Sequence, residues 1–103
     1  MNWVHHITKL RSGETIQFRP TGNSMQGKVE SGQLCTVEPV KDPSTLKEGD
    51  IVLVKVHGNV CFHLIKKVAV NGVRKFLIGN NKGHDNGWAH EGAVFGRCIK
   101  VED

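Results

Sequence analysis

The feature that most restricts the fold is a series of closely spaced β-rich runs between residues 49 and 78. The runs cover residues 51–56, 60–68 and 73–78, and short turns that contain Gly58 and Gly72 separate them. β-rich runs on both sides of a short glycine-containing turn are typical of antiparallel hairpins. The centre of the chain is therefore predicted to be a hairpin followed by a third strand.

The rest of the chain adds strands on both sides of this centre and one short helix. Further strands are predicted at 15–19, 33–37 and 94–101. Residues 2–11 are predicted to form the helix, because Trp3, Ile7 and Leu10 recur at helical spacing. The stretch 79–87 is rich in glycine and asparagine and is predicted to be a loop. The fold class is therefore mainly β with one short N-terminal helix.

Length and charge limit the number of domains and the class of partner. The 103 residues suit one domain, with 1–13 as the helical segment and 14–103 as the β core. A net charge of +4 and an aromatic content of 6% favour a solvated basic face over a nucleic-acid surface. The apolar runs are too short to cross a bilayer and no signal peptide is evident, so we expect a cytoplasmic protein without a membrane partner.

The cysteine and histidine spacing favours neither a disulfide framework nor a metal site. The three cysteines are widely and irregularly spaced: Cys35, Cys61 and Cys98. An odd number at such spacing indicates a reducing compartment. Cys61 and His63 with His84 or His90 have no recognised ligand spacing, and residues 79–83 lack the pattern of a phosphate-binding loop. We therefore expect no metal and no cofactor.

The tetrapeptide Gly22-Asn23-Ser24-Met25 contains a candidate nucleophile. It follows a predicted strand that ends at Pro20, so the Ser24 hydroxyl is expected on an exposed turn. Such a turn offers an attacking oxygen and, beside it, a backbone N–H that can stabilise an oxyanion. Serine and glycine are also common in ordinary turns, so the tetrapeptide alone is compatible with a purely structural role.

His63 and Asp85 are the candidates for proton transfer. Period-two alternation places His63 on the same strand face as Cys61 and Ile65. An imidazole, with its ordinary pKa near 6.5, suits a general base, whereas the plainer interpretation is a core or edge histidine bonded to a backbone carbonyl. Asp85 has the chemistry to orient an imidazole, and equally to cap a turn.

Several short motifs follow one another in a distinctive order. They are Gly22-Asn23-Ser24-Met25, Gly32, Gly49-Asp50-Ile51-Val52, His63, Gly79-Asn80-Asn81 and Gly96-Arg97. This order resembles the signal-peptidase and LexA-type serine peptidase superfamily, and the resemblance runs from about Thr15 to Val101.

The resemblance implies a LexA/signal-peptidase-like β-rich fold and a role for each candidate residue. Ser24 is implied as the nucleophile, and Gly22, Asn23 and Met25 as its oxyanion and substrate-binding neighbours. His63 stands where most bacterial members carry the lysine base, as in eukaryotic and archaeal-type signal peptidases. In such histidine-type enzymes an aspartate completes the site, and Asp85 is the residue that best matches it.

Some positions depart from the pattern of the family. Gly27 stands where proline is common, Gln33 where aspartate often follows glycine, and Asn80 where the late loop often has aspartate. These positions mostly shape turns. Lys66 and Lys67 are substitute bases in principle, but Lys66 would face the opposite way and Lys67 would lie two pleats beyond His63.

Two functions remain open on this basis. One is a soluble serine peptidase with a Ser24–His63 dyad, optionally completed by Asp85, that acts on extended peptides with small side chains near the cut. The other is a catalytically idle member that binds a protein as a regulatory or inhibitory module. Only 23 residues precede Ser24, so we expect neither a DNA-binding domain nor a membrane anchor, but a stand-alone domain that resembles small phage proteins.

Overall fold

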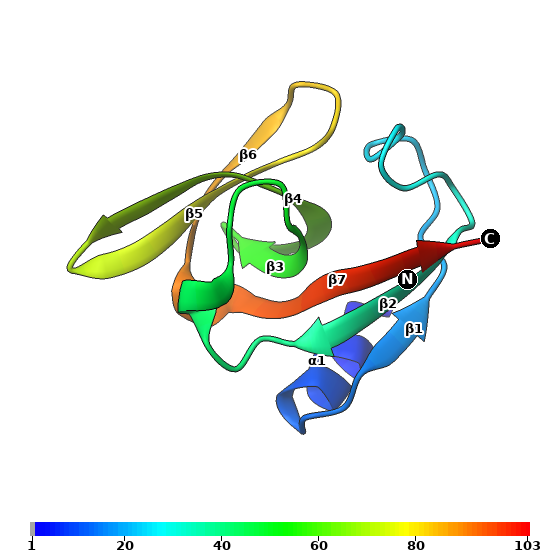
Figure 1. Cartoon of the computed structure of the whole chain (residues 1–103), viewed down its shortest axis with the longest axis horizontal. Coiled ribbons are helices and arrows are strands. Elements are labelled where there is room, and N and C mark those ends of the chain that lie inside the picture. Colours follow the sequence, from blue (N-terminus) through cyan, green and yellow to red (C-terminus); the bar gives the residue numbers. More distant parts are fainter. Residues whose placement is uncertain (1) are drawn as a thin grey trace.

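The computed structural model describes residues 2–103, which form a seven-stranded sheet and one α-helix (Figure 1). The strands are β1 (Ile16–Phe18), β2 (Leu34–Pro39), β3 (Ile51–Val56), β4 (Asn59–Asn71), β5 (Val73–Gly79), β6 (Asp85–His90) and β7 (Val94–Glu102). The helices are α1 (Trp3–Arg11) and two 3-10 turns, η1 (Pro43–Thr45) and η2 (Glu91–Ala93). The mainly β class with one N-terminal helix is confirmed. Met1, part of the predicted helical segment, lies outside the described residues.

All neighbouring strands pair antiparallel, in the order β1-β2-β7-β3-β4-β5-β6. The predicted hairpin is β3–β4, and its two-residue turn places His57 at a φ of 48°. β4 is longer than predicted and, with β5, forms an arm that projects from the rest of the sheet (Figure 1).

The prediction of a loop over residues 79–87 is wrong in its last part. β6 starts at Asp85 and pairs with β5, with Ile78 opposite Gly87 and Phe76 opposite Ala89. The segment has little intrinsic preference for a strand, because it combines glycine with small and polar residues. The segment is a strand because it pairs with the buried strand β5, and not because its own residues favour an extended conformation.

The core consists of two apolar clusters, one on each side of β3. Leu53 belongs to the cluster that α1 covers, whereas Val52 and Val54 belong to the cluster between β3, β5 and β6. All three side chains are fully buried, as expected for the strand in the middle of the sheet. The alternation of β4 continues this division, since Phe62 packs in the first cluster and Cys61 against the second.

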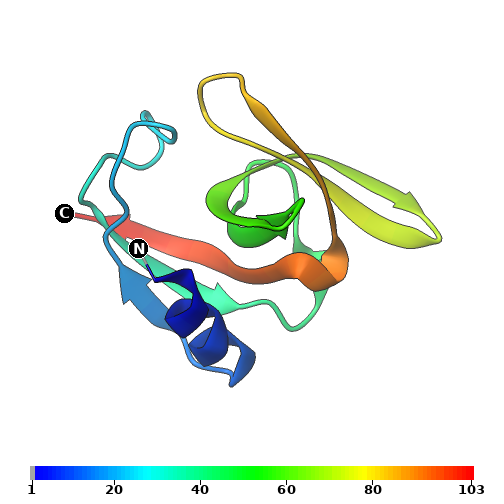
Figure 2. The same cartoon turned by 180° about the vertical axis from the view of Figure 1, so that it is seen from behind.

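The helix α1 packs on the β1–β2–β7 side of the sheet, as Figure 2 shows from behind. Its close approach requires a residue without a side chain in β7. A Cβ on Gly96 would lie 2.6 Å from Val37 Cγ1 and 2.9 Å from Leu10 Cδ1. This contact determines where α1 lies, and with it the position of Trp3 at the start of the helix.

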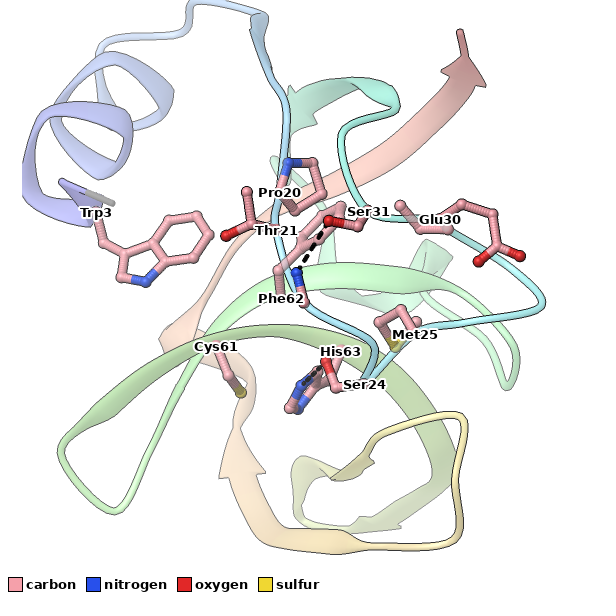
Figure 3. Close-up of a pocket in the computed structure, with 12 residues that line it drawn as sticks. Trp3, Pro20, Thr21, Ser24, Met25, Glu30, Ser31, Cys61, Phe62 and His63 are labelled. Atoms are coloured by element: carbon pink, nitrogen blue, oxygen red, sulfur yellow. Dashed lines mark hydrogen bonds between the residues drawn. The ribbon is translucent and has the colours of Figure 1, made fainter.

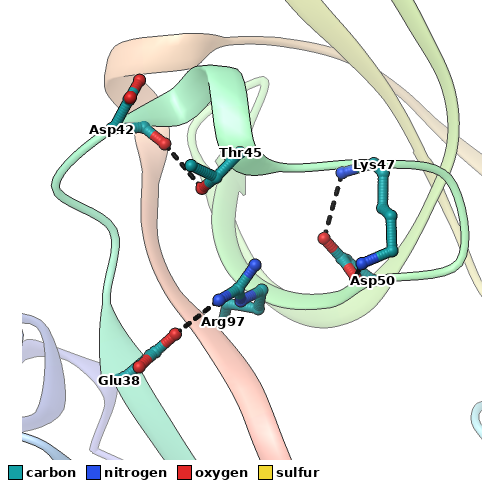
Figure 4. A network of polar contacts seen from close by, with 6 residues as sticks. All are labelled: Glu38, Asp42, Thr45, Lys47, Asp50 and Arg97. Atoms are coloured by element: carbon teal, nitrogen blue, oxygen red, sulfur yellow. Dashed lines mark hydrogen bonds and ion pairs between the residues drawn. The ribbon is translucent and has the colours of Figure 1, made fainter.

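The Gly49-Asp50 motif fixes the start of β3 against β4. The N–H of Gly49 donates to the Ile65 carbonyl at 2.9 Å, and the N–H of Ile65 donates to the Asp50 carbonyl at 2.9 Å. The Asp50 carboxylate accepts from the Lys47 N–H at 3.0 Å (Figure 4). The corner needs glycine because Gly49 has a φ of +90°. These hydrogen bonds fix the pairing between the start of β3 and β4 at Ile65, which is two residues after His63.

Phe76 is a test of the second core cluster. It is fully buried in β5, and truncation of a buried phenylalanine to alanine leaves a cavity. We expect Phe76→Ala to lower the free energy of unfolding by about 3–5 kcal/mol. Urea denaturation followed by circular dichroism measures this loss. Val70→Ala is the control, since Val70 is 61% exposed and should change the free energy by no more than about 0.5 kcal/mol. An equal effect of the two substitutions would contradict the described core.

Candidate active site

Ser24 lies in the long connection between β1 and β2, where two apolar neighbours anchor the chain. Met25 and Val29 are only 5% and 3% exposed and belong to the first core cluster. The N–H groups of Lys28 and Val29 both donate to the Met25 carbonyl, at 3.0 and 2.8 Å. With Met25 pointing inward, the adjacent Ser24 is presented on the exposed side of the turn.

Other hydrogen bonds close the base of this connection. The Gly32 N–H donates to the Pro20 carbonyl at 2.7 Å, and the Gly22 N–H donates to Ser31 Oγ at 3.2 Å. Gly22 has a φ of +105°, which a side chain would disfavour. The carbonyl of Asn23 accepts from the Gln26 N–H at 3.1 Å. The tetrapeptide is therefore a tightly bonded turn, and each of its residues has a structural role besides any chemical one.

A second loop holds the Ser24 turn in place. The Asn81 N–H donates to the Ser24 carbonyl at 2.9 Å, and Asn81 Nδ2 donates to the Gln26 carbonyl at 2.7 Å. Gly27 leaves room for this contact, since a Cβ there would lie 3.0 Å from Asn81 Nδ2. The sequence analysis identified the Gly79-Asn80-Asn81 motif but not this clamp between the β5–β6 loop and the Ser24 turn.

The structure brings Ser24 and His63 together. His63 Nε2 lies 3.2 Å from Ser24 Oγ, within hydrogen-bond distance (Figure 3). The two residues come from segments 39 positions apart, the β1–β2 connection and β4. His63 shares a strand face with Cys61, as its alternation predicts. This is the geometry that a nucleophile and its base require.

The third member of the cluster is Asn86, one residue beyond the predicted Asp85. Asn86 Oδ1 lies 2.7 Å from His63 Nδ1. Successive side chains of a strand point to opposite faces, so within β6 only one of the two neighbours faces His63. Asp85 lies instead beside Gly79, where a Cβ would be 2.9 Å from its Oδ1. The structure does not bring Asp85 to His63. The residue was missed because β6 was predicted as a loop, which has no alternating faces.

The environment of His63 keeps its imidazole neutral near pH 7. Burial lowers its pKa below the ordinary 6.5, the hydrogen bond to Asn86 opposes this, and the nearby His84 lowers the pKa further. With Asn86 Oδ1 facing Nδ1, the amide oxygen accepts and the proton is assigned to Nδ1. Nε2 then holds a lone pair directed at the Ser24 hydroxyl.

The backbone N–H groups of Ser24 and of the next residue, Met25, have no partner among the described residues. Within residues 2–103, the N–H groups of Ser24 and Met25 donate no hydrogen bond to another protein atom. Unpaired backbone donors beside a serine hydroxyl are groups that can stabilise an oxyanion.

The other nucleophiles and bases near the site are not placed for the same chemistry. Lys66 lies toward Gly79, where a Cβ would be 3.0 Å from its Cε, and the Lys67 side chain is exposed. Burial raises the pKa of the Cys61 thiol to about 11, so it is protonated at neutral pH. Among the described residues, no three His, Cys, Asp or Glu side chains are grouped as metal ligands would be.

A cavity of about 290 Å³ opens beside Ser24 and His63 (Figure 3). Its wall includes Trp3 of α1, Met25 of the Ser24 turn and Phe62 of β4. Ser24 and His63 thus lie at the edge of a hollow whose wall combines these apolar side chains with polar ones such as Thr21, Glu30 and Ser31.

Comparison with known families identifies the family to which this fold belongs. A family model described as Peptidase S24-like matches residues 2–98. The chain belongs to the peptidase S24-like family. The match spans α1 to the middle of β7 and so includes Ser24, His63 and Asn86. It also confirms the resemblance to the LexA and signal-peptidase superfamily. The search of curated proteins found no match.

The S24-like chain has histidine as the partner of its serine, and asparagine as the partner of that histidine. Membership in the family establishes a peptidase-type fold. No helix within residues 2–103 has the length and apolarity that crossing a membrane requires.

Proposed function

We propose that this S24-like protein is a serine peptidase in which Ser24 is the nucleophile, His63 the general base and Asn86 the residue that orients the base. The observation that supports it most is the continuous pair of contacts from Ser24 Oγ to His63 Nε2 and from His63 Nδ1 to Asn86 Oδ1. A histidine with a purely structural role needs only one polar partner. His63 has a polar partner at each ring nitrogen, and one of the two is a serine hydroxyl.

The chemistry follows from these contacts. Ser24 Oγ attacks the carbonyl carbon of a peptide bond while its proton passes to His63 Nε2. The N–H groups of Ser24 and Met25 stabilise the oxyanion. The imidazolium then gives its proton to the leaving amine, which leaves an acyl group on Ser24. Water, deprotonated by His63, hydrolyses the ester and restores the free hydroxyl.

Asn86 plays a limited part in this reaction. Its Oδ1 accepts from Nδ1–H and so holds the tautomer whose Nε2 accepts the serine proton. Unlike a carboxylate, it adds no negative charge to stabilise the imidazolium. An asparagine in this role has precedent in cysteine peptidases with a Cys-His-Asn arrangement.

The sheet offers a place for an extended substrate next to His63. Pairing between β4 and β5 begins at Leu64, whereas β4 pairs with β3 from Asn59 onward. Residues 60–63 therefore have a strand partner on only one side within the described chain. Alternate residues there direct N–H and C=O groups away from β3, and a peptide can bind such an edge as an added strand.

A pool of diverse peptides, with products identified by mass spectrometry, tests the proposal. The wild-type protein should cut a subset of the peptides, and Ser24→Ala and His63→Ala should cut none of them. Absence of cleavage by the folded wild-type protein would favour the alternative, a non-catalytic module that binds peptides along the same free edge of β4. The neutral Asn86 in place of a carboxylate is the observation that favours this alternative.

The pH dependence of cleavage should report the protonation of His63. Only neutral His63 accepts the serine proton, so kcat/KM should be level above pH 7 and fall as the pH drops through the lowered pKa of His63, below 6.5. Initial rates between pH 5 and 8.5 measure this. Asn86→Asp should move the midpoint upward, because a carboxylate favours the imidazolium. A rate that needs pH above 9 would indicate a lysine base instead.

A further inference from the structure

The cavity beside Ser24 is larger than a small side chain requires. Its volume is about 290 Å³ and it is open to solvent on one side, whereas about 10–15 Å³ of such space is enough to hold one water molecule. A methyl group would leave most of this space unfilled. The cavity reaches Ser24 and His63 themselves, so a side chain bound in it belongs to a residue close to the cleaved bond.

Aromatic side chains form a fixed wall on the α1 side of the cavity. Trp3 packs edge-on against Phe18, with ring centroids 5.4 Å apart, and Phe18 packs in the same way against Phe62 at 5.0 Å. Trp3 and Phe62 line the cavity directly. Interlocked aromatic contacts of this kind are favourable and hold the rings in defined orientations. Trp3 belongs to α1, and Gly96 allows that helix to lie close to the sheet. The helix therefore forms part of the cavity wall.

The charge of the lining residues limits which side chains can bind in the cavity. With His63 neutral, Glu30 is the only one of the described lining residues (within 2–103) whose side chain carries a formal charge. Its side chain is exposed at the edge of the cavity and points away from the apolar wall in Figure 3. A carboxylate at this edge repels an acidic side chain, while the apolar wall disfavours any charge that enters unpaired.

We infer that this cavity is a specificity pocket for one bulky apolar side chain, such as Leu, Met or Phe, next to the bond that Ser24 attacks. The inference rests on the proposed peptidase function. It differs from the small side chains that the resemblance to the superfamily implies, because here Trp3 of α1 provides a wall that bounds a larger space.

Peptide binding tests the pocket separately from cleavage. The probes are N-acetylated, C-amidated hexa-alanine peptides in which Leu, Phe or Glu replaces one alanine at each position in turn. The protein is Ser24→Ala combined with Trp88→Phe, which leaves Trp3 as its only tryptophan. The fluorescence of Trp3 then reports binding at the pocket. We expect the Leu and Phe peptides to bind at least about tenfold more tightly at one position than hexa-alanine, and the Glu peptides to bind more weakly than hexa-alanine.

Two variants change the pocket in opposite directions. Thr21→Phe adds a side chain to the exposed rim and should reduce the preference for Leu over Ala to less than about twofold. Trp3→Ala removes the wall and should weaken binding of the Leu peptide by about tenfold; here binding is followed by isothermal calorimetry. Should Trp3→Ala fail to fold, Thr21→Phe still tests the pocket, because it removes no core contact.

The outcomes separate the pocket from the peptidase proposal. Preferred binding of Leu or Phe peptides without cleavage by the wild-type protein supports the pocket and contradicts the peptidase. Cleavage with alanine favoured at every position near the cut supports the peptidase and overturns the pocket. Equal binding of all peptides, or a preference that Thr21→Phe leaves unchanged, also overturns it.

Discussion

Replacing Ser24 with alanine is expected to lower kcat/KM for peptide cleavage by at least about 10³-fold, to the background rate. The substitution removes the attacking oxygen, and with it every step that passes through an acyl-enzyme. Fold stability should change little, since Ser24 is exposed and, among residues 2–103, its hydroxyl has a hydrogen bond only with His63. Initial rates with a peptide from the pool, together with a thermal melt, measure both effects.

Ser44→Ala is the matched control for this substitution. Ser44 lies in η1, and its hydroxyl bonds Asp42 rather than a residue of the site. Its loss should leave kcat/KM within about twofold of the wild type. Cleavage that persists in Ser24→Ala and needs His63 would mean that His63 activates a different nucleophile, and the assignment of Ser24 would be wrong.

Asn86→Ala is expected to lower kcat by about 10²–10⁴-fold, because His63 then loses the partner that fixes its tautomer and ring orientation. KM should change far less, since Asn86 contacts the base and does not line the cavity beside Ser24. Steady-state kinetics separate the two parameters. Long-range proton–nitrogen NMR of the imidazole should show Nδ1 protonated in the wild type and a mixture of tautomers in Asn86→Ala.

Asp85→Ala provides the comparison, because it removes a carboxylate from the adjacent position of β6. Asp85 does not contact His63, so we expect kcat within about threefold of the wild type. If Asp85→Ala were the more damaging of the two, the acidic residue implied by the superfamily resemblance would be the functional one. The orientation of β6 described here would then not be that of the active protein.

The strands around the site were predictable because their sequence signals are local. The runs around Gly58 and Gly72 are unambiguous, and His63 follows from alternation along β4 once that strand is recognised. Ser24 was identifiable only through the order of motifs from Gly22 to Arg97 that resembles the superfamily, because the tetrapeptide around it also fits an ordinary turn. Short-range sequence is enough to place the strands, whereas the roles of Ser24 and His63 depend on the resemblance.

Asn86 and Trp3 were not predictable in their roles, because these depend on long-range packing. β6 is a strand only because β5 lies beside it, and without that strand no alternation distinguishes Asn86 from Asp85. The spacing of Trp3, Ile7 and Leu10 indicates a helix face but not what that face covers. Its place beside the cavity depends on Gly96 of β7, which is 93 positions away in the sequence.

Acylation of Ser24 by an activated ester is the measurement that tests the central claim most directly, since it requires no knowledge of the natural substrate. The protein is incubated with the p-nitrophenyl ester of an N-acetylated leucine peptide, quenched in acid and mapped by mass spectrometry. We expect one acyl group on Ser24 at pH 8, far less at pH 5, and none in His63→Ala. A folded wild-type protein that releases no p-nitrophenol at pH 8 and keeps Ser24 unmodified, or a Ser24 that is modified equally in His63→Ala, would contradict the claim that His63 activates Ser24.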